Sequence, residues 1–111
     1  MHPALAGAAA AAVWGVLEPL DRRLFRCDYS DLALLGGGRR GFAIHMVNGA
    51  SFGLVARRLR IDPVAFALAE HAALWPLLVF VDPATARSPR AYAQGLFRHA
   101  VFGLVLRRLT R

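Results

Sequence analysis

Four apolar segments divide the chain, at residues 4–20, 41–56, 64–81 and 91–106. The first has no polar side chain between Ala4 and Leu17, and the third has only Glu70 and His71. A surface helix of a soluble bundle needs a polar face opposite its apolar stripe, and these segments lack one. Each has about the shortest length that spans a bilayer as a helix, roughly 17 residues. The pattern predicts an all-α fold, a four-helix transmembrane bundle; the alternative is a soluble or oligomerising helical bundle.

Helix start signals precede the last two segments. Asp62 and Ser88 each stand directly before a proline, which is the order of an N-cap residue and a first helical position. Helices are therefore expected to begin near Pro63 and Pro89, and "VDP" at 81–83 is expected to close the third helix.

The longest connection, residues 21–40, contains "CDYSDLALLGGGRR". Ser30 or Asp31 could cap a short helical turn that carries three leucines. The three glycines Gly36–Gly38 then give the chain the conformational freedom to turn back into the membrane. This pattern predicts a short interfacial segment between the first two helices. A plain flexible loop is the alternative.

The charge distribution points to the same location. All fourteen basic residues are arginines, and most stand in pairs at the ends of the apolar segments, at 22–23, 39–40, 57–58 and 107–108. Membrane spans are flanked in this way, whereas a nucleic-acid surface needs arginines on one polar face. We expect a multi-pass protein of the cytoplasmic (inner) membrane, with both termini inside, the lipid bilayer as its partner and no nucleic acid. Cys27 is the only cysteine, so an internal disulfide is excluded.

An internal repeat relates the two halves. "SFGLVARRL" at 51–59 and "VFGLVLRRL" at 101–109 match at seven positions with an offset of fifty. The chain is therefore expected to form a single membrane domain, 1–111, of two tandem helical hairpins, 4–56 and 64–106. Because each hairpin has an even number of spans, both Arg-Arg-Leu ends should lie on the same side of the membrane.

Glycines at helical spacing predict close helix packing. Small residues recur every three or four positions, so they share a face and let backbones approach in lipid. The second and fourth apolar segments also correspond at an offset of 54 residues. At this offset His45 aligns with His99, and glycines flank both histidines at four-residue spacing. The predicted packing positions are Gly7, Gly15, Gly41, Gly49, Gly53, Gly95 and Gly103.

The ionisable and amide side chains within the apolar segments form a predicted polar seam: Glu18, His45, Asn48, Glu70, Arg98 and His99. The helical rise places Glu18 near the depth of His45, and Glu70 near that of His99. A charge at the centre of a span costs about 2.5–3.5 kcal/mol, so Glu70 should face the bundle. Pro19 and Pro76 each follow an acid and predict a kink or local unwinding there.

Three interpretations of the seam remain open. It is a structural network, in which Arg98 forms an ion pair with Glu70, or it responds to a proton, an ion or a small ligand. In the third interpretation, His45 and His99 bind a haem or a metal ion. The first two interpretations require no cofactor. His71 points about 100° away from Glu70 and is expected to pack beside Trp75 or to form a hydrogen bond with a neighbour.

The segments "WGVLEPL", "HMVNGASFG", "AEHAALWP" and "RHAVFGLVL" resemble a group of small bacterial membrane proteins with four spans, similar to the DUF1440/YagU-type family. The resemblance covers all four helices and implies an inner-membrane location with no assigned activity. The matching positions are Glu18, Pro19, His45, Asn48, Gly49, Glu70, Trp75, Pro76 and His99.

Sequence signatures of common enzymes are missing. No phosphate loop, dinucleotide fingerprint, nucleophile elbow or zinc-protease motif is present. These absences favour a membrane protein that is not an enzyme, while an intramembrane enzyme stays open as an alternative. The ligand is not predicted. Because a unit of four spans with glycine faces encloses little interior, self-association is also predicted.

Overall fold

The computed structural model describes residues 1–111, and all its regular elements are helical. The long helices are α1 (Pro3–Phe25), α3 (Gly38–Leu59), α4 (Pro63–Leu74), which the 3-10 helix η1 (Trp75–Phe80) continues, and α6 (Pro89–Thr110). Two single turns, α2 (Asp31–Leu34) and α5 (Pro83–Ala86), lie in the connections. The predicted all-α fold is confirmed, and three of the long helices, α1, α3 and α6, extend past their apolar segments into turns that carry arginine.

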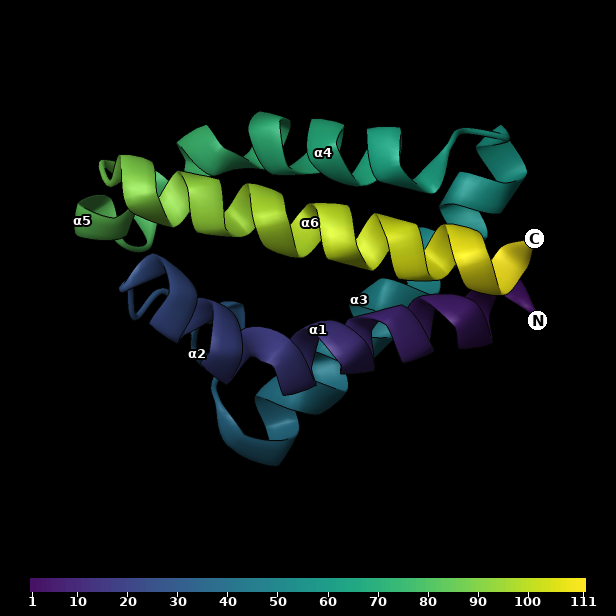
Figure 1. Ribbon diagram of the computed structural model, residues 1–111, viewed down its shortest axis with the longest axis horizontal. Helices are drawn as coiled ribbons and strands as arrows, with labels where there is room; N and C mark the ends of the chain where they lie inside the picture. The colour runs from purple at the N-terminus through teal and green to yellow at the C-terminus, as the bar shows by residue number, and fades with distance from the viewer.

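The helices form two antiparallel pairs, α1 with α3 and α4 with α6 (Figure 1). The pairs meet where α1 packs against α6, whereas α3 and α4 contact each other at few points. Both termini lie at one end of the molecule, and α2 and α5 lie at the other (Figure 1). The arrangement leaves a space between α3 and α4 that no helix fills.

Local signals place the helix starts. The Asp62 carboxylate accepts hydrogen bonds from the backbone N–H groups of Val64 and Ala65, at 3.0 Å each. The Ser88 hydroxyl accepts one from Ala91, and Ser30 caps α2 in the same way. These caps match the predicted starts, including the short helical turn in the 21–40 connection.

The two prolines within the helices have different effects. At Pro76 the α-helix gives way to the 3-10 helix η1, so the α-helix is interrupted there, but by a tighter winding and not by the predicted unwinding. At Pro19 no interruption is found, because α1 continues unbroken to Phe25. Since α1 lies between α3 and α6, packing on two sides holds it helical past Pro19, whereas η1 is covered mainly by α5.

Glycines occur where backbones nearly touch. A β-carbon on Gly49 would lie 2.5 Å from the carbonyl oxygen of Gly7, at the crossing of α1 and α3. Gly53 faces the first turn of α1 at Pro3, and Gly103 faces the first turn of α4 at Pro63. The offset of fifty therefore describes the structural repeat. The other predicted packing glycines also lie at close approaches: Gly15 to a phenylalanine ring, Gly41 to α2 and Gly95 to an imidazole.

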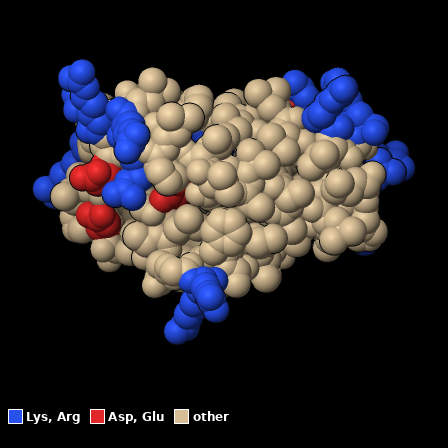
Figure 2. All heavy atoms as spheres, turned by 60° about the horizontal axis from the view of Figure 1, so that its bottom comes forward, with Lys and Arg blue, Asp and Glu red and all other residues tan.

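The interior holds small side chains and the outside large ones. Most buried hydrophobic residues are alanines, joined by Trp14, Phe52, Phe102 and Leu106, whereas many leucines and valines are exposed. Figure 2 shows basic side chains mainly at the two ends of this face, with a broad uncharged area between them. Two segments, Pro3–Phe25 and Pro63–Phe80, are long and apolar enough to cross a membrane.

Candidate functional site

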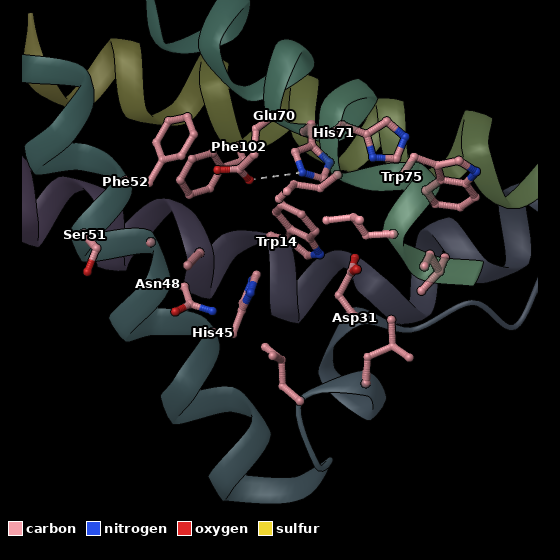
Figure 3. A pocket seen from close by; sticks show the side chains of 18 of the residues that line it. Trp14, Asp31, His45, Asn48, Ser51, Phe52, Glu70, His71, Trp75 and Phe102 are labelled. Atoms are coloured by element: carbon pink, nitrogen blue, oxygen red, sulfur yellow. Dashed lines mark ion pairs between the residues drawn. The ribbon is translucent and has the colours of Figure 1, made fainter. Parts of the chain in front are cut away.

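A cavity of about 700 Å³ occupies the space between α3 and the α4–η1 segment (Figure 3). Of its 22 lining residues, 14 are hydrophobic. Trp14 and Ala11 of α1 and Phe102 of α6 line it from the central helices, and Leu34 and Leu35 line it beside α2. Four of the six predicted seam residues line this cavity: His45, Asn48, Glu70 and His99.

Glu70 and His99 both line the cavity and form a close pair on one side of it. The Nε2 atom of His99 lies 3.7 Å from Oε1 of Glu70, as the predicted grouping of these residues requires. The Nδ1 atom of His99 lies 2.7 Å from the carbonyl oxygen of Gly95, which can only accept, so Nδ1 carries a proton. At 3.7 Å the Nε2 atom and the carboxylate oxygen are close but lie beyond hydrogen-bond distance.

Trp14 lies against two of the cavity histidines. Its ring centroid is 4.8 Å from that of His45 and 4.7 Å from that of His99, both edge-on. The indole N–H of Trp14 and the Nε2 atom of His45 are buried and have no hydrogen-bond partner. A buried polar group without a partner costs about 1–3 kcal/mol, so these two groups are suited to a polar atom of a ligand.

His71 is held in place by its surroundings. Its Nε2 atom lies 3.1 Å from the carbonyl oxygen of Tyr92, and its ring is 5.1 Å from the ring of Trp75. The expected packing beside Trp75 is confirmed. The ring also fits against Gly95, where a β-carbon would clash with it, and lies 4.6 Å from the His99 ring.

The other two seam residues, Glu18 and Arg98, belong to a separate buried cluster. Arg98 contacts Asp21 through Nε at 2.8 Å and Nη2 at 2.7 Å, and Asp31 through Nη1 at 3.1 Å. Its Nη2 also donates to the carbonyl oxygen of Tyr29 at 2.6 Å. We call Glu18, Asp21, Asp31, Gln94 and Arg98 the arginine cluster.

Two predicted pairings are therefore wrong. Arg98 does not pair with Glu70, because successive side chains on α6 point about 100° apart and Arg98 faces α1 while His99 faces Glu70. Glu18 does not pair with His45; it accepts a hydrogen bond from the Ser30 hydroxyl, and its other oxygen lies 3.8 Å from Arg98.

The sequence interpretation missed most of the arginine cluster. Asp21 was assigned to a connection, but α1 continues through it and turns it toward α6. Gln94, one turn before Arg98 on α6, donates to Asp21 at 2.8 Å. The four-residue spacing of Gln94 and Arg98 was a usable signal. The Tyr29 hydroxyl donates to Asp31, and burial raises the pKa of Tyr29 well above its ordinary value.

No group of three or more His, Cys, Asp or Glu side chains converges as the ligands of a metal ion would. Comparisons with protein-family models, with curated proteins and with solved structures give no match for this chain. The resemblance carried by the four sequence motifs therefore stays a prediction. The geometry of the cavity is the basis for assigning a function.

Proposed function

We propose that this chain is an integral protein of the cytoplasmic membrane that crosses the bilayer four times. Only 11% of the apolar window of Pro63–Phe80 is buried within the protein, whereas the core helix of a soluble protein would be mostly buried. Small side chains inside and large apolar ones outside are typical of helices packed in lipid. The α3 and α6 helices have 22 residues each, about 33 Å at 1.5 Å per residue, which exceeds the ~30 Å hydrocarbon core.

Membrane fractionation tests this location. We expect the expressed chain to stay in the membrane pellet after washing with alkaline carbonate and to enter solution only with detergent. Release by carbonate alone would refute integration into the bilayer.

Within the membrane, we propose that the cavity between α3 and α4 binds a small apolar molecule with a hydrogen-bonding head. The observation that carries this proposal is that two residues lining this largely apolar cavity, Trp14 and His45, have buried side-chain nitrogen atoms without a hydrogen-bond partner. Ligand sites in proteins combine these features, with volumes of about 300–1,000 Å³ and a few placed polar groups. An acceptor such as a carbonyl oxygen would satisfy the indole N–H, and the apolar body would contact Phe52 and Phe66.

Tryptophan fluorescence gives a direct test, because both tryptophans of the chain, Trp14 and Trp75, line the cavity. We expect a benzoquinone with a decyl tail to quench the detergent-solubilised protein with a saturable curve. Decylbenzene, which has the same tail and no acceptor, should compete more weakly.

A matched pair of variants separates binding in the cavity from partition into the micelle. Ser51→Phe places a ring in the cavity from an exposed position, so quinone binding should weaken severalfold. Leu54→Phe adds a ring to the same helix outside the cavity and should leave binding unchanged. Quenching that does not saturate, or that is equal in both variants, would contradict the proposal.

The Glu70–His99 pair favours a second candidate, a site that responds to protons. Imidazoles as a class titrate near neutral pH, and the His99 ring lies beside the Glu70 carboxyl group in the wall of the cavity, with 3.7 Å between Nε2 and Oε1. His71 and Trp14 are the other ring systems against His99. If the pair acts in this way, quinone binding should depend on pH between about 5 and 8, and Glu70→Gln should change that dependence. Identical pH profiles in the two proteins would reject this candidate.

A further inference from the structure

A second hollow, of about 500 Å³, lies at the end of the molecule that holds both termini. It is formed by the last turns of α3 and α6, the turn at 60–62 and the start of α4. Ala56 and Leu106, both buried, line it together with Gly53 and Pro63. Three arginines line it as well: Arg57, Arg58 and Arg60.

These three arginines have no acidic partner. Under the repeat, Arg57 corresponds to Arg107, and Arg107 forms an ion pair with Asp62 at 3.3 Å. Asp62 has the only acidic side chain at this end of the molecule, and none of the three arginines forms an ion pair with it. The positive charge around the hollow is therefore not neutralised within the protein.

Two of the backbone carbonyl oxygens near the hollow, which would otherwise repel an anion, are occupied by hydrogen bonds. The carbonyl oxygens at the end of a helix carry partial negative charge and would repel one. At the end of α3, however, Arg60 N–H donates to the carbonyl oxygen of Arg57, and Ile61 N–H donates to that of Ala56, at 3.2 Å each. The arginine side chains are exposed and free to turn toward a bound group.

We propose that this hollow binds a phosphate group, and specifically the headgroup of an anionic phospholipid. Guanidinium groups match phosphate oxygens in geometry and charge, and basic pockets between spanning helices bind lipid headgroups. The apolar lining residues beside the arginines can contact the start of an acyl chain. The lipid source rests on the proposed membrane location, whereas the phosphate chemistry does not.

Native mass spectrometry of the detergent-solubilised chain tests the site, with phosphatidylglycerol, phosphatidylcholine and inorganic phosphate as separate probes. We expect phosphatidylglycerol to bind in preference to phosphatidylcholine. The combined variant Arg57→Gln, Arg58→Gln and Arg60→Gln should weaken phosphatidylglycerol binding by about tenfold or more. Because these side chains are exposed, the helical content and melting temperature should stay unchanged.

A variant with the same charge change at the opposite end is the matched control. Arg39→Gln, Arg40→Gln and Arg87→Gln removes three exposed arginines that form no ion pair, and it should retain most of the binding. Equal losses in the two variants would overturn the proposal, because general attraction would then explain the binding. Inorganic phosphate that binds as tightly as the lipid, and is lost only in the first variant, would keep the phosphate site and overturn the lipid source. That result would stand whether or not the chain passes the carbonate test.

Discussion

The arginine cluster should be a principal electrostatic contributor to stability, and Arg98→Leu tests this expectation. The Arg98 side chain is 1% exposed, and the Asp21 and Glu18 side chains are 2% and 4% exposed. Removing the guanidinium leaves both carboxyl groups in the interior without their cation.

The expected magnitude follows from that burial. Removing one partner of a buried ion pair typically costs about 3–5 kcal/mol, because the remaining charge is uncompensated. Glu70→Gln should cost only about 0–1 kcal/mol, since the Glu70 side chain is 38% exposed and its partner lies at 3.7 Å. The structure therefore predicts that Arg98→Leu lowers the free energy of unfolding much more than Glu70→Gln does. If Arg98 and Glu70 formed a direct ion pair, the two losses would be similar.

The free energy of unfolding can be measured by titrating the purified protein from mild detergent into dodecyl sulfate and following helicity by circular dichroism. Asp21→Asn in the Arg98→Leu background removes one uncompensated charge and keeps an acceptor for Gln94. The double variant should therefore be more stable than the sum of the single changes by about 1–2 kcal/mol. A loss below 1 kcal/mol in Arg98→Leu, or an equal loss in Glu70→Gln, would refute the reasoning.

Two further changes test the packing and capping of the helices. Gly49→Ala should destabilise the chain by about 1–3 kcal/mol, because the new β-carbon meets Gly7 at the α1–α3 crossing, while Ser51→Ala serves as a nearly neutral control in the same titration. The backbone N–H of Ala65 lowers the pKa of Asp62 below its ordinary 3.8, so this cap is fully present above that pH and is lost as the pH falls through the lowered value. The protection of the Ala65 amide, taken relative to its intrinsic exchange rate at each pH, should therefore fall in acid. Asp62→Asn should remove that pH dependence; an unchanged profile would contradict the assignment.

Local features of the fold were predictable from the sequence. Asp62 and Ser88 act as caps because a side-chain oxygen two or three residues before an open N–H group needs no distant partner. The same reasoning placed α2 after Ser30. The repeat predicted hairpin geometry, since equivalent glycines at 53 and 103 face equivalent first turns.

The pairing of polar side chains was only partly predictable. Depth along a helix brought Glu70 and His99 together correctly, because both lie on facing sides of α4 and α6. For Glu18, depth along the helix predicted the wrong partner, His45. Its actual partners are Ser30 in the connection and Arg98 on α6. Rotation about the helix axis decides which neighbour a side chain meets, and one residue changes that direction by about 100°.

The sequence by itself determined the helical elements, their starts, the glycine contacts and the inward placement of Glu70, because these follow from local hydrogen bonding, side-chain size and helical period. The tertiary structure alone decided that Asp21 and Asp31 surround Arg98, and that α3 and α4 stand apart around a cavity. Those outcomes depend on how far α1 extends and at what angles the two hairpins meet. Both are set by contacts between residues distant in the chain, which no local pattern encodes.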